Sequence, residues 1–284
     1  MKKAIKKLLG ASYQPLREIY YKLKQVWSIV CFCLTGKYFL NRRELKKLKN
    51  CYAGKRCFII CNGPSLLAKD LTKIYENGDI SIGMNAIPRI YTETPWRPTI
   101  LSATDDMVFD PKNYDLIKNC DANIKIYNRT RYLKSLGSKG KLIYLSFDES
   151  VALLDHPRFD TDAMKKLPSI GTSTYSLIEF AFFLGCSEIY ILGCDMSYAV
   201  NLNRDGSITY NDSGKEHFYK TDEDSHVTNE AKPNPTWQME TAYEYIAEYA
   251  GEHGLKVYNA TRGGKLECFE RVDFDSLFPS AEYC

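Results

Sequence analysis

The chain alternates short apolar stretches with segments in which apolar residues recur every three or four positions. Seven apolar stretches of four to six residues predict buried strands, at 56–61, 79–82, 99–103, 123–127, 141–145, 188–192 and 255–258. Segments 65–76, 173–185 and 237–253 have the length and spacing of helices. Strands that alternate with helices in this way predict an α/β fold, with a mostly parallel sheet covered by helices on both faces.

The first 50 residues differ from the rest in pattern and charge. One face of a predicted helix would hold Leu16, Ile19, Tyr20, Leu23, Val26, Trp27 and Val30. The segment carries 13 lysines and arginines against two acids, a net charge of +11, which leaves −8 for the remainder because the whole chain carries +3. Such a helix suits an anionic membrane surface; alternatively, its apolar stripe packs on the protein's own core or on a second subunit.

These differences divide the chain into two parts. Residues 1–50 are expected to form a basic amphipathic arm, and residues 51–284 a single catalytic domain. Within that domain, the polar segment 200–236 predicts a long, lid-like loop, because structureless segments of this length in compact domains are often functional.

Composition and absent motifs exclude several classes of protein. At 44% hydrophobic and 13% aromatic residues, the chain is expected to fold, and no apolar run reaches the length of about 18 residues that indicates a transmembrane helix. It shows no signal-peptide pattern, so we expect a cytoplasmic protein. The ten cysteines form no C-x-x-C pair, which argues against a zinc site or a disulfide framework. The P-loop motif, the dinucleotide glycine fingerprint and the G-x-S-x-G elbow are all absent.

Small polar residues follow the predicted strands, where ligands bind in an open parallel sheet. The candidates are Asn62, Gly63 and Ser65 after the first strand, Asn85 after the second, Asp105 after the third, Gly193, Asp195 and Tyr198 after strand 188–192, and Thr172 and Ser173 at the start of helix 173–185. Gly63 permits close backbone approach, and Ser65 is expected to cap the next helix, whose free N–H groups suit a phosphate. Together these residues predict a nucleotide-type pocket.

Two of the four histidines, His217 and His226, lie in the polar segment 200–236. His226 is close to Asp222, Glu223 and Asp224, and neighbouring carboxylates are expected to raise the pKa of its imidazole. His226 is therefore either a general base or an exposed loop histidine.

Three segments resemble known families. The sequences "CNGPSL" at 61–66 and "TSTYSLIEFAFFLGCSEIYILGCDMSY" at 172–198 resemble the bacterial sialyltransferases that sialylate lipooligosaccharide. The chain also looks like the broader 6-hydroxymethylpterin diphosphokinase (MptE-like) family, which includes flagellin-modifying motility accessory glycosyltransferases. The sequence "YNATRGGKLECFERVDFDSLF" at 258–278 has the look of that group's C-terminal signature. The resemblance covers roughly residues 55–278 and leaves the arm outside.

The resemblance implies a Rossmann-like, GT-A-type glycosyltransferase domain. It would transfer an acidic sugar, sialic-acid- or Kdo-like, from a CMP-activated donor to a cell-surface glycan, with no metal or other cofactor. In this scheme the donor-binding residues are Asn62, Gly63 and Ser65 on the nucleotide, Asn85 on the phosphate or ribose, Thr172 and Ser173 facing the donor, and Gly193 and Asp195 at the cytidine end. Tyr198 would assist the departing phosphate, and His226 would act as the base on the acceptor hydroxyl.

The sequence departs from the family pattern in three places. Ser197 stands where the family has a tyrosine, with Tyr198 one position later, and Thr174 stands where glycine is usual. Asn234 lies near the position of the family's second loop histidine. These departures leave the donor sugar and the identity of the base open.

Two other functions remain open. A pterin diphosphokinase would need ATP and Mg²⁺, with Asp105, Asp106 or Asp195 on the metal. A non-enzymatic scaffold would use the basic arm, although the acidic main body argues against broad nucleic-acid binding. The main expectation is a transferase with a nucleotide-sugar donor and a glycan or lipid-linked glycan acceptor. Its arm would contact the inner membrane face or a second copy of the chain.

Overall fold

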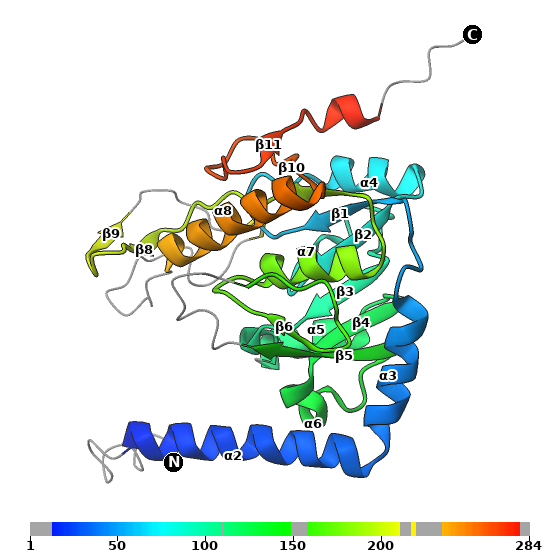
Figure 1. Cartoon of the computed structure of the whole chain (residues 1–284), viewed down its shortest axis with the longest axis vertical. Coiled ribbons are helices and arrows are strands. Elements are labelled where there is room, and N and C mark those ends of the chain that lie inside the picture. The colour runs from blue at the N-terminus through cyan, green and yellow to red at the C-terminus, as the bar shows by residue number, and fades with distance from the viewer. Residues whose placement is uncertain (1–12, 110, 149–157, 211–216, 220–234, 279–284) are drawn as a thin grey trace.

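The computed structural model describes residues 13–109, 111–148, 158–210, 217–219 and 235–278. Within these ranges the main sheet has nine strands in the order β11-β10-β7-β1-β2-β3-β4-β5-β6 (Figure 1). Each pair of neighbours is parallel. The strands are β1 Arg56–Ile60, β2 Ile80–Met84, β3 Ile100–Ala103, β4 Ile124–Asn128, β5 Lys141–Asp148, β6 Lys166–Pro168, β7 Glu188–Leu192, β10 Lys256–Asn259 and β11 Glu270–Arg271.

The α/β fold class predicted from the sequence is confirmed. All seven predicted strands and all three predicted helices are present, with ends shifted by three residues at most. From β1 the chain adds strands β2 to β6 on one side, and then crosses back to place β7 on the other. The order therefore reverses between β1 and β7, and ligands bind at such switch points in doubly wound sheets.

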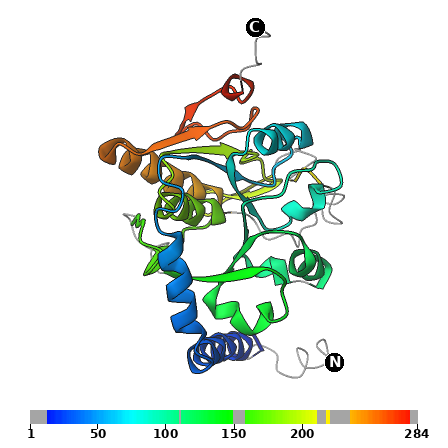
Figure 2. The same ribbon diagram turned by 90° about the vertical axis from the view of Figure 1, so that its right-hand side faces the viewer.

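Two apolar cores lie on opposite faces of the sheet, because successive side chains of a strand point to opposite sides. In β1, Cys57 and Ile59 belong to one core, and Phe58 and Ile60 to the other. The first core is covered by α7 (Ser173–Phe183), α8 (Thr236–His253) and α3 (Lys37–Leu48). The second is covered by α4 (Ala68–Glu76) and α5 (Pro111–Asn119). Figure 2 shows the helices on the two sides of the sheet.

Short elements complete the chain. They are the helix α6 (Tyr132–Ser135), the 3-10 helices η2 (Ile87–Ile90), η3 (Asp106–Phe109), η4 (Arg129–Arg131) and η6 (Asp275–Leu277), and the strands β8 (Val200–Leu202) and β9 (Ile208–Tyr210). Strands β8 and β9 pair antiparallel. The segment 200–236, which the sequence predicts as one long loop, therefore begins with a β-hairpin.

The predicted N-terminal helix is present as α2 (Tyr13–Leu34) and turns into α3 at Gly36, whose φ of 71° is in the left-handed region. Phe32 of α2 is fully buried, and its ring lies edge-on against Tyr132 and Tyr144. The opposite face of α2 is exposed in residues 19–34, which contradicts packing of the apolar stripe on the protein's own core. None of the helices in the described ranges is long and apolar enough to cross a membrane.

Candidate functional site

The carboxyl ends of β1 and β7 are joined through the segments that follow them. The Cys61 N–H donates to the Leu192 carbonyl at 2.9 Å, and the Gly63 N–H donates to the Gly193 carbonyl at 2.9 Å. These bonds continue the ladder beyond the last strand residues. They bring the predicted residues Asn62, Gly63 and Asp195 together at the switch point.

Ser65 contacts Asp195, 130 residues later in the chain. The Ser65 hydroxyl and its N–H both donate to Asp195 Oδ2, at 2.9 and 3.3 Å. The prediction that Ser65 caps the following helix is wrong, because α4 begins only at Ala68 and the residue before it, Leu67, makes no side-chain cap. The helix therefore starts after the glycine turn, and Ser65 of the turn is hydrogen-bonded to Asp195, which follows β7.

Gly63 is required by its neighbours within the protein. A Cβ at this position would overlap the Asp195 carboxylate and would lie 2.5 Å from the Gly193 carbonyl oxygen. The Asp195 side chain and the backbone after β7 therefore lie against Gly63, which only a residue without a Cβ permits.

The backbone on both sides of Asp195 is unusual. Gly193 has a φ of 71° and Met196 a φ of 53°, and a left-handed methionine costs conformational energy. Behind Asp195, the Lys265 N–H donates to its carbonyl at 2.9 Å, and Gly264 packs so closely that a Cβ would lie 2.9 Å from the Asp195 Cα. Ser65 on one side and the Gly264–Lys265 backbone on the other therefore fix the position of Asp195.

Burial acts on the charge of Asp195, whose residue surface is only 9% exposed. Removal from water raises the pKa of this carboxyl, and the hydrogen bonds from Ser65 act in the opposite direction. Asp195 is thus an enclosed hydrogen-bond acceptor at the rim of the sheet.

Asn62 and Asn85 contribute two further acceptors. Asn62 Nδ2 donates to the Met84 carbonyl at 3.1 Å, which places Asn62 beside the end of β2, where Asn85 follows. Asn85 has a φ of 51°, a conformation that asparagine tolerates better than most residues, and its N–H donates to the Ser102 carbonyl. The Oδ1 atoms of both asparagines are enclosed and, in the described residues, have no hydrogen-bond partner.

The start of α7 reaches the same region. Thr172 caps this helix, since its hydroxyl accepts from the Thr174 N–H at 3.3 Å, and Ser173 is the first helical residue. The Thr172 hydroxyl also lies 3.1 Å from the Tyr243 hydroxyl, which in turn lies 3.7 Å from Cys194 Sγ. Because Cys194 precedes Asp195, this chain of contacts connects the helix start to the β7 end.

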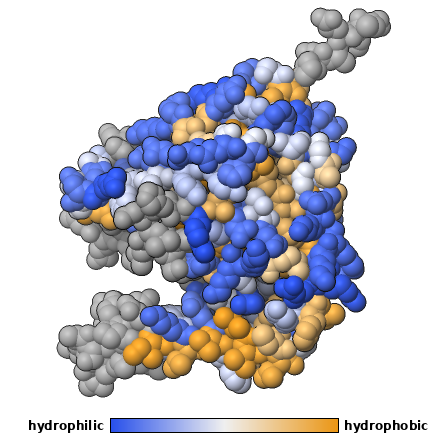
Figure 3. All heavy atoms as spheres, in the orientation of Figure 1, coloured by the Kyte–Doolittle hydropathy of each residue, from blue (hydrophilic) through white to orange (hydrophobic). Residues whose placement is uncertain are grey.

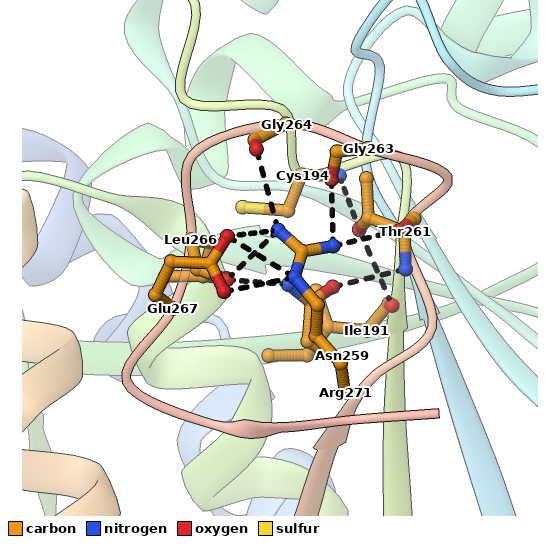
Figure 4. Close-up of polar contacts among 9 residues, drawn as sticks. All are labelled: Ile191, Cys194, Asn259, Thr261, Gly263, Gly264, Leu266, Glu267 and Arg271. Carbon is orange, nitrogen blue, oxygen red and sulfur yellow. Dashed lines mark hydrogen bonds and ion pairs between the residues drawn. The ribbon is translucent and has the colours of Figure 1, made fainter. Parts of the chain in front are cut away.

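A loop between β10 and β11 supports Asp195 from behind, and sequence reasoning missed it. The Cys194 N–H donates to Thr261 Oγ1 at 3.1 Å. The Arg271 guanidinium donates to the carbonyls of Thr261 and Gly263 at 3.2 and 2.8 Å, to those of Gly264 and Leu266, and to the Glu267 carboxylate (Figure 4). One side chain thus fixes most of the loop that contacts Asp195. The only signal in the sequence was the motif around 258–278.

A short segment, 217–219, also contacts the site. The Phe218 N–H donates to the Asn62 carbonyl at 2.9 Å, and Phe218 packs against the second core. Its neighbours His217 and Tyr219 stack on each other at 5.1 Å between ring centroids. His217 therefore lies one residue from a contact with the glycine turn.

Three predicted residues are less closely tied to this cluster. Asp105 lies exposed after β3, and Tyr198 is half-buried against the first core. His226 lies outside the described residues. In the part of the chain that the structure describes, no group of three or more His, Cys, Asp or Glu side chains is arranged to hold a metal ion.

Comparison with known proteins gives limited information. No family model matches the sequence, and no curated protein matches it. A solved structure with a similar fold is the MAf glycosyltransferase from Magnetospirillum magneticum AMB-1, at 14% sequence identity and a TM-score of 0.49. The match covers 86% of this chain but only 39% of that protein. A similarity at this level says nothing about donor, acceptor or mechanism, and the sialyltransferase and MptE-like resemblances stay predictions.

Proposed function

We propose that the protein is a glycosyltransferase that uses a nucleotide-activated sugar. The observation that carries this proposal is the set of enclosed oxygen acceptors at the switch point: Asp195 and the unpartnered Oδ1 atoms of Asn62 and Asn85. Hydroxyl and amino groups are the donors that such acceptors need, and a nucleoside carries both kinds. The position at the carboxyl edge of a parallel sheet agrees with a nucleotide ligand.

The sugar phosphate would lie toward α7. The eleven-residue helix presents its N-terminus beside Cys61, where Cys61 Sγ and Thr174 Oγ1 are 3.5 Å apart. Free N–H groups and the Ser173 hydroxyl at this end favour a phosphate oxygen. We assign Tyr198 to the departing phosphate, on the basis of the resemblance. A CMP-activated acidic sugar, sialic-acid- or Kdo-like, is the donor that the same resemblance favours.

The transfer step needs a base near the acceptor. The acceptor oxygen attacks the anomeric carbon, its proton passes to the base, and the bond from that carbon to the phosphate oxygen breaks to release CMP. A positioned base contributes about 10²–10⁴-fold to the rate. His226 is the base that the resemblance suggests, and His217 is a second candidate because Phe218 is bonded to Asn62. No metal is required in this scheme.

A ligand panel tests the proposal on the full chain. Thermal unfolding is measured with CMP, CDP, UDP, GDP and ATP, each with Mg²⁺ or with EDTA. CMP at about 100 times its dissociation constant should add about 2.7 kcal/mol to the free energy of unfolding, with or without EDTA. Stabilisation by ATP alone, dependent on Mg²⁺, would instead support a pterin diphosphokinase and overturn the proposal.

Paired variants localise the ligand. Asn85→Ala removes an unpartnered acceptor and should weaken CMP binding. Asn113→Ala is the control, because Asn113 Oδ1 pairs with Arg89 at the surface. Binding of CMP that is equal in both variants would contradict the assigned site. The acceptor that we favour is a glycan, free or lipid-linked, at the inner membrane face.

A further inference from the structure

The outer face of α2 is an apolar surface that no other part of the described chain covers. We call it the outer ridge; it consists of Ile19, Leu23, Val26, Trp27, Val30 and Leu34, whose exposed fractions run from 37% to 78%. Figure 3 shows hydrophobic surface, in orange, along the part of the molecule that α2 forms. Such a contiguous patch marks an interaction surface.

The ridge lies directly opposite the side of α2 that holds the helix to the protein. Ser28 and Phe32 form the inner side: both are buried, and the Leu133 N–H donates to Ser28 Oγ at 3.2 Å. At about 100° of rotation per residue, the six ridge residues fall within a sector of about 100° centred opposite Phe32. The helix is thus anchored on one side and apolar on the other.

Basic residues border the ridge. Lys22 and Lys24 are exposed, and the helical rotation places them on opposite sides of it. Beyond the turn at Gly36, α3 runs steeply away from α2 (Figure 1) and carries the exposed residues Phe39, Arg43 and Lys46. Lysine side chains at such borders can direct their ammonium groups to lipid headgroups while their stems stay near the apolar face.

We propose that the outer ridge docks the protein on an anionic lipid surface, with α2 lying in the plane of the headgroups. Charge decides between this partner and a second copy of the chain. Residues 1–50 carry a net charge of +11, and the sequence from 19 to 34 contains no Asp or Glu. Pairing two such helices would bring like charges together with Glu18 as the single acid of α2 to offset them, whereas an anionic membrane supplies the opposite charge.

Docking through α2 would place the candidate site several strand spacings above the membrane surface. The inner side of α2 contacts η4 and α6, which directly follow the carboxyl end of β4. Four strand spacings separate β4 from β7, or about 19 Å along the edge that holds Asp195. That a membrane-bound acceptor reaches this site rests on the proposed function; the docking itself does not.

Vesicle binding by the full chain tests the docking, without any sugar donor present. Co-sedimentation is measured with vesicles of phosphatidylcholine alone and of phosphatidylcholine mixed with phosphatidylglycerol. We expect binding to the mixed vesicles that weakens as salt increases. The double variant Leu23→Glu/Trp27→Glu should lose about tenfold or more in affinity. Tyr75→Glu is the control, because Tyr75 is a similarly exposed aromatic residue, 55% against 59% for Trp27, on α4 at the far end of the molecule (Figure 1).

Further variants test the charges. Lys22→Glu/Lys24→Glu should reduce binding to the mixed vesicles, while Lys69→Glu on α4 should change it little. Circular dichroism checks that each variant is folded. The proposal is overturned by equal binding to neutral and mixed vesicles, by no binding to either, or by a dimer in sedimentation velocity that Leu23→Glu/Trp27→Glu abolishes. Because CMP binding is measured separately, failure of the docking and failure of the glycosyltransferase proposal are distinguishable.

Discussion

The site at the β1–β7 edge and the outer ridge of α2 differ in how completely the protein satisfies its own groups. Around Asp195, groups from the glycine turn, the end of β7 and the β10–β11 loop bond to one another, and the amide oxygens of Asn62 and Asn85 stay without a described partner. On α2, a whole helix face stays uncovered. Hydrogen bonds and apolar contacts made within the chain stabilise the fold. Polar atoms without a partner and uncovered apolar faces indicate where a ligand or a membrane binds.

The largest expected effect is a difference in stability between substitutions on the two faces of α2. Phe32→Ala removes a fully buried ring that packs on Tyr132 and Tyr144, and should lower the free energy of unfolding by about 3–5 kcal/mol. Leu23→Ala, on the ridge, should change it by less than about 0.5 kcal/mol. Urea unfolding measures both. Equal losses would mean that the ridge is covered in solution.

Gly63→Ala should have the next largest effect, at the other region. The added methyl group competes with the Asp195 carboxylate and the Gly193 carbonyl, so we expect a loss of about 1–3 kcal/mol in stability together with weaker nucleotide binding. The control is Gly251→Ala in α8, where the new methyl group meets open space and alanine is the better helix former. A Gly63→Ala protein as stable as Gly251→Ala would contradict the described packing.

Arg271→Gln tests the loop behind Asp195. It removes the guanidinium that holds the carbonyls of Thr261 and Gly263, and should cost about 1–2 kcal/mol while weakening CMP binding through the displaced loop. Arg43→Gln, an exposed arginine on α3, is the matched control. Titration calorimetry with CMP measures the second effect. An unchanged affinity for CMP in Arg271→Gln would show that the loop does not position the site.

The last expected effect depends on pH and concerns Glu179, a fully buried carboxyl in α7. One oxygen accepts from the Asp160 N–H at 2.9 Å, and the other has no described partner. Burial raises the pKa of Glu179 to about 9 from an ordinary value of 4.5. The folded state therefore holds a proton that the unfolded chain releases, so stability decreases as pH rises from about 4.5 toward 9.

Glu179→Gln stays neutral at every pH and should avoid this loss. At pH 5 the variant should match the parent protein closely, and between pH 5 and pH 8 it should gain up to about 4 kcal/mol over the parent, since each of these three pH units costs the parent at most about 1.4 kcal/mol. Melting temperatures across this pH range measure the difference. A constant difference at all pH values would show that Glu179 is already ionised in the folded protein.

The fold was largely predictable, because each long strand carries its own local pattern. The strand 188–192 and the helix 173–185 need only their own residues to be recognised. Strands β6 and β11 have three and two residues, which is too short for any pattern, and the hairpin β8–β9 lies in a polar segment. Helix α2 was predictable as amphipathic, but the side that faces the protein depends on Tyr132 and Tyr144, about 100 residues away.

The positions of several candidate residues were predictable, but their contacts were not. The rule that ligand sites follow parallel strands selected Asn62, Asn85 and Asp195. It could not show that Ser65 bonds to Asp195 instead of capping a helix, because that choice depends on a partner 130 residues later. Arg271 was missed for a related reason: only the folded β10–β11 loop presents its carbonyls to one guanidinium.

The contact between Gly63 and Asp195 has a consequence for how such sequences can diverge. A methyl group at 63 would occupy the volume of the Asp195 carboxylate, so a shorter residue at 195 removes one of its two close contacts and leaves the one with the Gly193 carbonyl oxygen. Gly63→Ala combined with Asp195→Gly should therefore recover part of the stability lost by Gly63→Ala. In related chains we expect these two positions to change as a pair.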